Sequence, residues 1–197
     1  SAGKDFGAKW ENYFNEKYGM EFSGEKKIIL VTAHRRENFG EGLKNICEAL
    51  LDISKKRPDI LFVYPVHPNP NVRKAVFGML RGAPGILLTE PLDYEPFLFL
   101  MNKAFIILSD SGGIQEEISL MGKPILVLRK TTERPEAVAA GNAMLVGAEK
   151  NTIIRETSRL LDEPAHYASM AKKHGAFGDG FAAEKITAAL NNFPLSG

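Results

Sequence analysis

Continuous apolar runs alternate with amphipathic segments along this chain, and this alternation constrains the fold more than any other feature. Residues 27–33 form the first run, and residues 42–56 then repeat apolar side chains at the i, i+3, i+4, i+7 and i+8 spacing of a helix. A strand that is apolar throughout is typical of a parallel sheet whose crossover helices cover both faces. The sequence therefore predicts an α/β protein with a doubly wound, Rossmann-like parallel sheet.

The later runs complete the expected order of elements. Strands are expected at residues 60–64, 86–88, 104–108, 124–128 and 143–146. Helices are expected at residues 71–81, 94–102, 113–122, 151–162, 165–174 and 181–192. Ligands of such sheets bind outside the carboxyl ends of the strands, so the loops that follow the strands are expected to carry the site residues.

Residues 6–18 precede the first strand and are aromatic-rich and amphipathic. In a one-domain protein they would form an extra packed helix, whereas in a fragment they would form a helix that leads in from another domain. The sequence shows no internal repeat and no low-complexity linker between the later elements.

Charge and cysteine content argue against several classes of partner. With a net charge of +1, nothing in the composition indicates nucleic acid or an anionic membrane as a partner. No apolar run approaches the roughly 18 residues of a transmembrane helix. The single cysteine, Cys47, excludes an internal disulfide and a cysteine-based zinc site, and it suits a reducing cytoplasm.

Residues 109–117 (Ser-Asp-Ser-Gly-Gly-Ile-Gln-Glu-Glu) join an apolar run to a predicted helix. Unpaired N–H groups and the dipole at a helix N-terminus favour an anion there, and Gly112 and Gly113 let the backbone approach it closely. The segment therefore indicates a phosphate-binding turn. The alternative is that Asp110 or Ser111 is only the N-cap of the helix.

Helix geometry separates the two glutamates of this segment. At about 100° per residue, Glu117 lies on the same side as Ile114, whereas Glu116 lies nearly opposite and is expected to be solvated. An inward carboxylate is costly unless it is hydrogen-bonded, and a ribose diol would satisfy it in bidentate fashion. The alternative partner for Glu117 is an arginine or a lysine.

Other strand ends carry cationic, imidazole or flat apolar side chains. These segments are residues 34–38, 65–70, 91–97 and 129–136. Because they should lie at one edge of the sheet, we expect a site for a polyanion such as a diphosphate, with Leu92 and Phe97 as an apolar wall for a base.

Each of these segments also has an ordinary structural interpretation. His34 could be a hydrogen-bonded histidine at a strand end, and Arg35 and Arg36 could pair with Glu37 on a solvated surface. His67, between prolines, could brace a rigid loop. Residues 131–136 could form a polar loop, and the apolar residues near 92–97 could belong to the core.

Taken together, residues 34–38, 64–70, 109–117 and 131–136 resemble the motifs of the non-hydrolysing UDP-N-acetylglucosamine 2-epimerases. The resemblance runs from residue 26 to the C-terminal helix and implies the C-terminal half of a two-domain GT-B architecture. Members of that family interconvert UDP-N-acetylglucosamine and UDP-N-acetylmannosamine, which feeds bacterial surface polysaccharide synthesis.

The resemblance also implies a role for each matched residue. Leu92 and Phe97 would border the uracil, Glu117 would bind the ribose hydroxyls, Ser111, Gly112 and Gly113 would bind the β-phosphate, and Arg134 would reach the phosphates. His34 would be the catalytic group at the sugar–diphosphate junction. Arg35 and His67 match a regulatory site for a second UDP-N-acetylglucosamine and would be allosteric.

In such enzymes UDP leaves by elimination across C1–C2 of the sugar and adds back after C2 is reprotonated on the other face. Because the C2 hydrogen is barely acidic, the chemistry depends on stabilising the departing diphosphate. The resemblance implies no nicotinamide, no other cofactor and no metal. It implies a cytoplasmic enzyme and, in the full-length protein, a homodimer.

The family's N-terminal domain, with its acid/base carboxylates, has no counterpart in this sequence. We therefore expect residues 1–22 to be a lead-in helix from a missing half, residues 23–197 to be the UDP-binding domain, and the chain alone to be inactive. Two departures from the family pattern, Ser119 and residues 174–177 before the Gly-Asp-Gly turn at 178–180, are expected to be structural. The alternatives are the donor-binding half of a GT-B glycosyltransferase and a non-catalytic nucleotide-sugar sensor.

Overall fold

The computed structural model describes residues 2–22, 24, 26–178 and 180–193. The predicted domain boundary at residue 23 and Asp179 of the Gly-Asp-Gly turn fall outside these residues. Among the described helices, none is long and apolar enough to cross a membrane.

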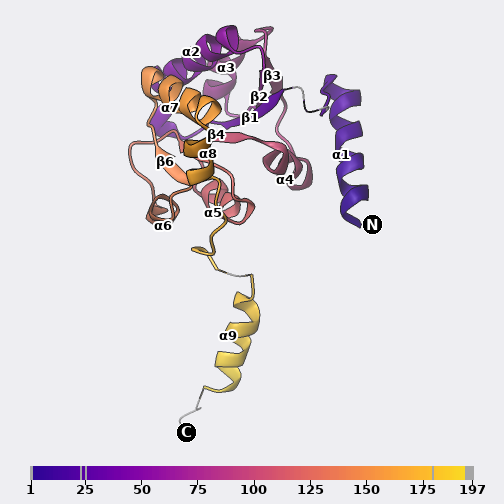
Figure 1. The fold of residues 1–197 in the computed structure, drawn as a ribbon, viewed down its shortest axis with the longest axis vertical. Coiled ribbons are helices and arrows are strands. Elements are labelled where there is room, and N and C mark those ends of the chain that lie inside the picture. Colours follow the sequence, from indigo (N-terminus) through magenta and orange to yellow (C-terminus); the bar gives the residue numbers. More distant parts are fainter. Residues whose placement is uncertain (1, 23, 25, 179, 194–197) are drawn as a thin grey trace.

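Six parallel strands form one sheet in the order β3-β2-β1-β4-β5-β6 (Figure 1). The strands are β1 (Lys27–Thr32), β2 (Ile60–Pro65), β3 (Ile86–Thr89), β4 (Ile106–Ser109), β5 (Ile125–Val127) and β6 (Ala143–Leu145). The predicted doubly wound, Rossmann-like sheet is therefore confirmed.

Helices connect successive strands and flank the sheet. They are α1 (Ala2–Tyr18), the 3-10 helix η1 (Arg36–Asn38), α2 (Glu41–Lys56), α3 (Pro70–Leu80), α4 (Tyr94–Lys103), α5 (Gly112–Met121), α6 (Pro135–Ala139), α7 (Lys150–Asp162), α8 (Pro164–Met170) and α9 (Ala182–Asn191).

The sheet carries a hydrophobic core on each face. Alternate residues of β1 serve the two cores: Ile29 and Val31 pack with α2, α3, α7 and α8, whereas Ile28 and Leu30 pack with α1, α4, α5 and α6. This two-sided burial explains why the strands read as continuous apolar runs rather than as an alternation of apolar and polar residues.

The strand order reverses between β1 and β4, which lie side by side at the centre of the sheet. At their carboxyl ends Thr32 is in register with Ser109, and the two hydroxyl oxygens lie 2.7 Å apart. The loops after β1 and β4 leave this point in opposite directions, which is where ligands of such sheets bind.

Two predicted boundaries differ from the observed ones for local reasons. The strand expected from residue 104 begins at Ile106, because the N–H of Ala104 still bonds to the carbonyl of Leu100 at the end of α4. The helix expected at residues 165–174 ends at Met170. Beyond it, the N–H of His174 donates to the carbonyl of Ser119 at 3.0 Å, which holds this segment against α5.

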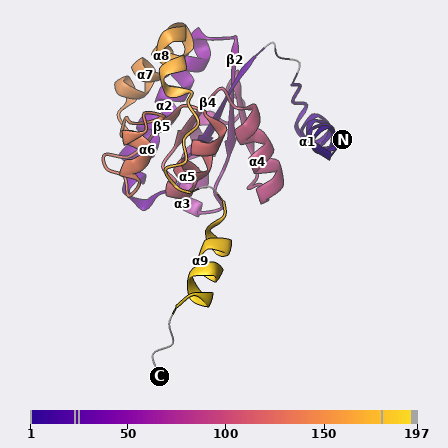
Figure 2. The same ribbon diagram turned by 60° about the horizontal axis from the view of Figure 1, so that its bottom comes forward.

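The two terminal helices differ in how much they bury. In α1, Phe14 is fully buried and stacks on Phe99 of α4, with ring centroids 5.9 Å apart. By contrast, α9 contains no buried residue, and Figures 1 and 2 both show it projecting away from the rest of the domain.

Candidate functional site

The loop after β1 is fixed to the end of β4 by one buried carboxylate. Asp110 is fully buried, and its Oδ2 accepts hydrogen bonds from the backbone N–H groups of His34 and Arg35, both at 2.8 Å. The same oxygen accepts from Nδ2 of Asn38 at 3.1 Å. The geometry of residues 34–38 is therefore set by a side chain from the neighbouring strand end.

The turn after β4 presents the N-terminus of α5 without a side-chain cap. Ser111 is the N-cap residue, but its side chain makes no capping hydrogen bond, and its own N–H donates to Oγ of Ser109 at 3.0 Å. The alternative in which Asp110 serves only as an N-cap is wrong, because its carboxylate accepts hydrogen bonds from the loop after β1 instead. The first-turn N–H groups at Gly112 and Gly113 are thus left for an anion.

A guanidinium lies close to this turn. A Cβ atom added to Gly112 would lie 3.8 Å from Nη2 of Arg35, and one added to Gly113 would lie 4.0 Å from Oγ of Ser111. The loop after β1 therefore brings a positive charge to the same turn whose N–H groups and dipole favour an anion.

A cavity of about 200 Å³ lies beside the turn and brings together four of the predicted residues, His34, His67, Leu92 and Phe97. The full lining consists of Thr32, His34, Pro65, His67, Pro68, Pro91, Leu92, Phe97 and Ile114. The imidazoles of His34 and His67 are stacked, with centroids 4.8 Å apart and planes 10° from parallel. The lining is thus mostly aromatic and apolar, and Ile114 of α5 borders the cavity next to the turn after β4.

The environment of His34 lowers its pKa, mainly because the ring is partly buried. The carboxylate of Asp110 opposes this effect, whereas the neighbouring His67 and Arg35 lower the pKa further. His67 also braces its own loop, as one alternative predicted, since its Nδ1 accepts a hydrogen bond from the N–H of Asn69 at 3.1 Å.

Of the two glutamates of α5, Glu117 is partly buried, whereas Glu116 has a partner that helix geometry did not predict. Glu116, predicted to be solvated, is only 40% exposed and forms an ion pair with Nε of Arg134. Glu117 has no side-chain hydrogen bond or ion pair to any described residue, so the predicted alternative of an arginine or lysine partner is wrong within that part of the chain. Burial first, and the nearby Glu116 second, raise the pKa of Glu117.

The loop after β5 explains the position of Glu116. Oγ1 of Thr132 donates to Oε1 of Gln115 at 2.7 Å, and Nε2 of the same glutamine donates to the carbonyl of Ser111 at 3.1 Å. Gln115 is fully buried. These bonds hold residues 131–136 over the first turn of α5, where Arg134 meets Glu116.

The alternative in which Arg35 and Arg36 pair with Glu37 is also wrong. The partner of Glu37 is Arg129, whose Nε lies 2.6 Å from Oε1 of the glutamate. Arg129 is only 6% exposed and binds Glu133 as well. Arg35 is therefore not neutralised by the glutamate two residues further on.

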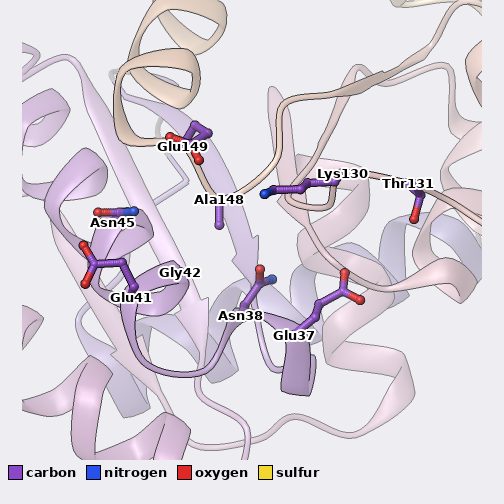
Figure 3. A pocket seen from close by; sticks show the side chains of 9 residues that line it. All are labelled: Glu37, Asn38, Glu41, Gly42, Asn45, Lys130, Thr131, Ala148 and Glu149. Atoms are coloured by element: carbon purple, nitrogen blue, oxygen red, sulfur yellow. The ribbon is translucent and has the colours of Figure 1, made fainter.

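A larger pocket of about 400 Å³ is bordered by η1, the start of α2 and the loops after β5 and β6 (Figure 3). It is lined by Glu37, Asn38, Glu41, Gly42, Asn45, Lys130, Thr131, Ala148 and Glu149. Figure 3 shows the side chain of Lys130 reaching into it opposite Glu41 and Asn45. Its three carboxylates outnumber its single lysine, so it suits an anion less well than the turn does.

The sequence did not reveal the structural partners of three buried polar residues, Asn38, Asp110 and Gln115. For Asp110 and Gln115 the signal was their position next to buried residues, because a buried polar group has to find a partner; Asn38 follows two exposed residues and gave no such signal. Among the described residues, no group of three or more histidine, cysteine, aspartate or glutamate side chains is placed to hold a metal ion.

The sheet order, the uncapped helix N-terminus at its switch point and the adjoining apolar cavity define a Rossmann-like α/β domain whose turn after β4 has the features that favour an anion. The model of the family described as UDP-N-acetylglucosamine 2-epimerase matches residues 7–191. The chain therefore belongs to the UDP-N-acetylglucosamine 2-epimerase family.

Curated relatives and solved structures agree with this assignment. UDP-N-acetylglucosamine 2-epimerases of Yersinia pestis and Campylobacter jejuni are 52% identical over 171 residues and 56% identical over 166 residues. These alignments cover 87% and 84% of this chain, but 46% and 43% of the relatives. The chain thus spans about half the length of the curated relatives it matches.

The Neisseria meningitidis UDP-GlcNAc 2-epimerase, solved with UDP-GlcNAc bound, superposes with a TM-score of 0.87 at 47% identity. The match covers 92% of this chain and 49% of that one. The S. aureus protein MnaA, solved with UDP, gives a TM-score of 0.82 at 38% identity and covers 92% of this chain and 52% of that one.

Proposed function

We propose that this chain is the nucleotide-binding half of a UDP-N-acetylglucosamine 2-epimerase, and that it binds UDP, the leaving group of the reaction. The observation that carries the proposal is the uncapped N-terminus of α5 at the switch point of the sheet. The family match, together with relatives solved with UDP-GlcNAc and with UDP, supports the choice of ligand.

In this proposal the turn after β4 binds the β-phosphate through Ser111, Gly112 and Gly113. Its N–H groups and the helix dipole would stabilise the negative charge that grows on the phosphate as the bond to the sugar breaks. Arg134 would reach the phosphates, and its Nη2 makes no hydrogen bond to a described residue, which fits that role.

Glu117 would bind the ribose hydroxyls, while Leu92 and Phe97 would border the uracil. The lack of a side-chain partner for Glu117 supports this assignment, because a half-buried carboxylate without a donor gains most from a diol. The cavity beside the turn, which Leu92 and Phe97 line, fits a planar base.

His34 would face the junction between sugar and diphosphate and act there as the catalytic group of this half. Arg35 and His67 would contact a second, regulatory UDP-N-acetylglucosamine. The stacking of the two imidazoles supports direct communication between the regulatory ligand and His34. A ligand that contacts His67 would contact a ring that itself packs on the ring of His34.

Epimerisation would proceed by elimination of UDP across C1–C2 and its re-addition after C2 is reprotonated. The groups on this chain would hold the departing UDP, and acid/base carboxylates on another half would move the proton at C2. We therefore propose that this chain alone is inactive, and that residues 1–22 lead in from that half while residues 23–197 form the UDP-binding domain.

The exposed apolar side chains of α9 are consistent with contact to a second half of the enzyme. Ile186 and Leu190, one helical turn apart, are 59% and 69% exposed although both are large and apolar. The matching relatives are about twice as long as this chain, so they contain a further body of protein that could cover such a helix.

We propose a homodimer for the complete enzyme, located in the cytoplasm, where the buried thiol of Cys47 would stay reduced.

Calorimetric titration of the 197-residue chain with UDP tests the proposal. We expect weak but measurable binding that is abolished in Glu117→Ala, because the ribose loses its carboxylate. Glu149→Ala is the matched control, since this exposed glutamate lies at the same edge of the sheet but away from the turn. Absence of UDP binding by chain whose circular dichroism shows it folded would contradict the proposal.

The alternative, a donor-binding half of a GT-B glycosyltransferase, shares the fold. A sucrose-phosphate synthase superposes with a TM-score of 0.63 but is only 14% identical, so this likeness concerns the fold alone. Solvent deuterium distinguishes the two, because epimerisation exchanges the hydrogen at C2 of the sugar and glycosyl transfer leaves it in place. The experiment needs the full-length protein, and the absence of any turnover there would favour a nucleotide-sugar sensor.

A further inference from the structure

The two oxygens of Asp110 are used very differently. Oδ2 accepts three hydrogen bonds, from His34 N, Arg35 N and Asn38 Nδ2. Oδ1 is fully buried and has no hydrogen-bond partner among the described residues. The basic group that faces it is Nδ1 of His34, 3.5 Å away, at the long edge of hydrogen-bond distance.

This geometry decides which ring nitrogen of His34 carries the proton. A lone pair on Nδ1 would face a buried carboxylate oxygen that has no other donor, which is costly for both groups. A proton on Nδ1 would be directed towards that oxygen, and it would stay on the imidazole because imidazole is the stronger base. Hydrogen bonds of this kind are often long in ligand-free sites and shorten when the ligand binds.

The orientation of the ring is restrained from two further sides. The backbone N–H of His34 is itself bound to Asp110 Oδ2, so the carboxylate fixes both the main chain and the ring of the same residue. On its face, the ring stacks on His67 at 4.8 Å. With Nδ1 turned to the carboxylate, the free lone pair is on Nε2.

We propose that Asp110 is the positioning residue of this site: it holds His34 with the proton on Nδ1, so that Nε2 is the nitrogen that meets the substrate. The inference rests on the proposed function of His34. A carboxylate behind an imidazole also stabilises the charged ring once Nε2 has taken a proton from solvent, and the Nε2–H could then donate a hydrogen bond to the departing diphosphate.

The charged and titratable groups around His34 come from three strand ends. Asp110 follows β4, His67 follows β2, and Arg35 lies on the same loop as His34 itself. The other residues that line the cavity, from the loop after β3, α4 and α5, are uncharged. Asp110 is therefore the group that favours the charged ring, against burial and two cationic or basic neighbours.

Nitrogen-15 NMR of the histidine rings in the ligand-free 197-residue chain tests the inference. The chain has four histidines, and loss of one signal set in His34→Gln assigns the ring of interest. We expect the Nδ1–H tautomer for His34 in the unmodified chain. In Asp110→Asn the amide can donate to Nδ1, so we expect the Nε2–H tautomer and a titration midpoint shifted to lower pH.

Asp93→Asn is the matched control, because it removes an exposed carboxylate from the same sheet edge and should leave both the tautomer and the midpoint of His34 unchanged. The Nε2–H tautomer in the unmodified chain would overturn the inference even if Asp110→Asn fails to fold. An unchanged tautomer in a folded Asp110→Asn would overturn it as well. Since the spectra are recorded without UDP, the two tests are independent. The tautomer can contradict this inference while UDP binding supports the proposed function, and UDP binding can be absent while the tautomer is as expected.

Discussion

The two sides of the candidate site differ in how completely their polar groups are paired. On one side, the loop after β1 and the turn after β4 are joined through Oδ2 of Asp110 and through the hydroxyl contact between Thr32 and Ser109, all of them buried. Oδ1 of Asp110 is the exception on this side, since it has no hydrogen-bond partner among the described residues. On the other side, Glu117 has no side-chain partner in the described structure, and Arg134 pairs with the partly exposed Glu116.

This difference suggests that one side of the site contributes mainly to folding stability and the other mainly to ligand affinity. The paired side fixes the positions of the turn after β4 and of His34 before any ligand arrives, which is the preorganisation that electrostatic stabilisation of a leaving group would require. The other side keeps the carboxylate of Glu117 without a side-chain partner in the described structure, and there Arg134 is paired through Nε and Nη1 but not through Nη2. We expect substitutions on the first side to reduce stability and those on the second to reduce affinity.

The largest effect is expected from Asp110→Ala. It leaves three N–H donors, those of His34, Arg35 and Asn38, without their acceptor in a buried place. We expect the free energy of unfolding to fall by at least about 3 kcal/mol, because each of the three unsatisfied donors costs roughly 1–3 kcal/mol and two of them are only partly buried. Urea denaturation followed by circular dichroism measures it.

Glu117→Ala is the matched substitution on the other side, since it removes a carboxylate that has no side-chain partner in the described structure. Its free energy of unfolding should stay within about 0.5 kcal/mol of the unmodified chain. Equal losses in the two variants would break the comparison between the two sides.

A smaller effect on the paired side is expected from Ser109→Ala. The substitution removes the contact with Oγ of Thr32 at 2.7 Å and the acceptor for the N–H of Ser111 at 3.0 Å. We expect the free energy of unfolding to fall by about 1–2 kcal/mol, and UDP affinity to fall too because the turn loosens. Ser169→Ala, on the exposed surface of α8, is the control, and an equal loss there would show that the site bonds have no special weight.

Much of the fold could be predicted from the sequence because both of its signals are local. Continuous apolar runs such as residues 27–33 belong to strands buried on both faces, and the spacing in residues 42–56 belongs to a helix. Topology then brings the strand ends to one edge, so His34, His67, Leu92 and Phe97 could be predicted to come together.

The pairing within the site could not be predicted, because it depends on loops that meet only in the folded chain. Helical geometry placed Glu116 in solvent, but residues 131–136 cover that side through the bond between Thr132 and Gln115. In the same way, Glu37 has Arg129 from a distant loop as its partner rather than an adjacent arginine. Such choices follow from tertiary packing rather than from spacing along the chain.

The smallest expected effect is a pH dependence that comes from the paired side. Burial lowers the pKa of His34 in the folded chain below the unfolded value of about 6.5, so the unfolded chain binds more protons between the two values. His34 therefore reduces stability as the pH falls below about 6.5. Urea denaturation at pH 7.5 and pH 5.5 should give a smaller difference for His34→Gln than for the unmodified chain.

Asp110 determines how small this effect is, because its carboxylate raises the pKa of His34 against burial. In Asp110→Asn the loss of stability between the two pH values should grow, since nothing then offsets the burial of the charged ring. His166→Gln, on α8, is the control and should leave the contribution of His34 unchanged. A different outcome would contradict this prediction: His34→Gln leaves the stability difference between the two pH values unchanged, while Asp110→Asn still increases it. The carboxylate of Asp110 would then act on a group other than His34, and the two sides of the site would differ only in packing.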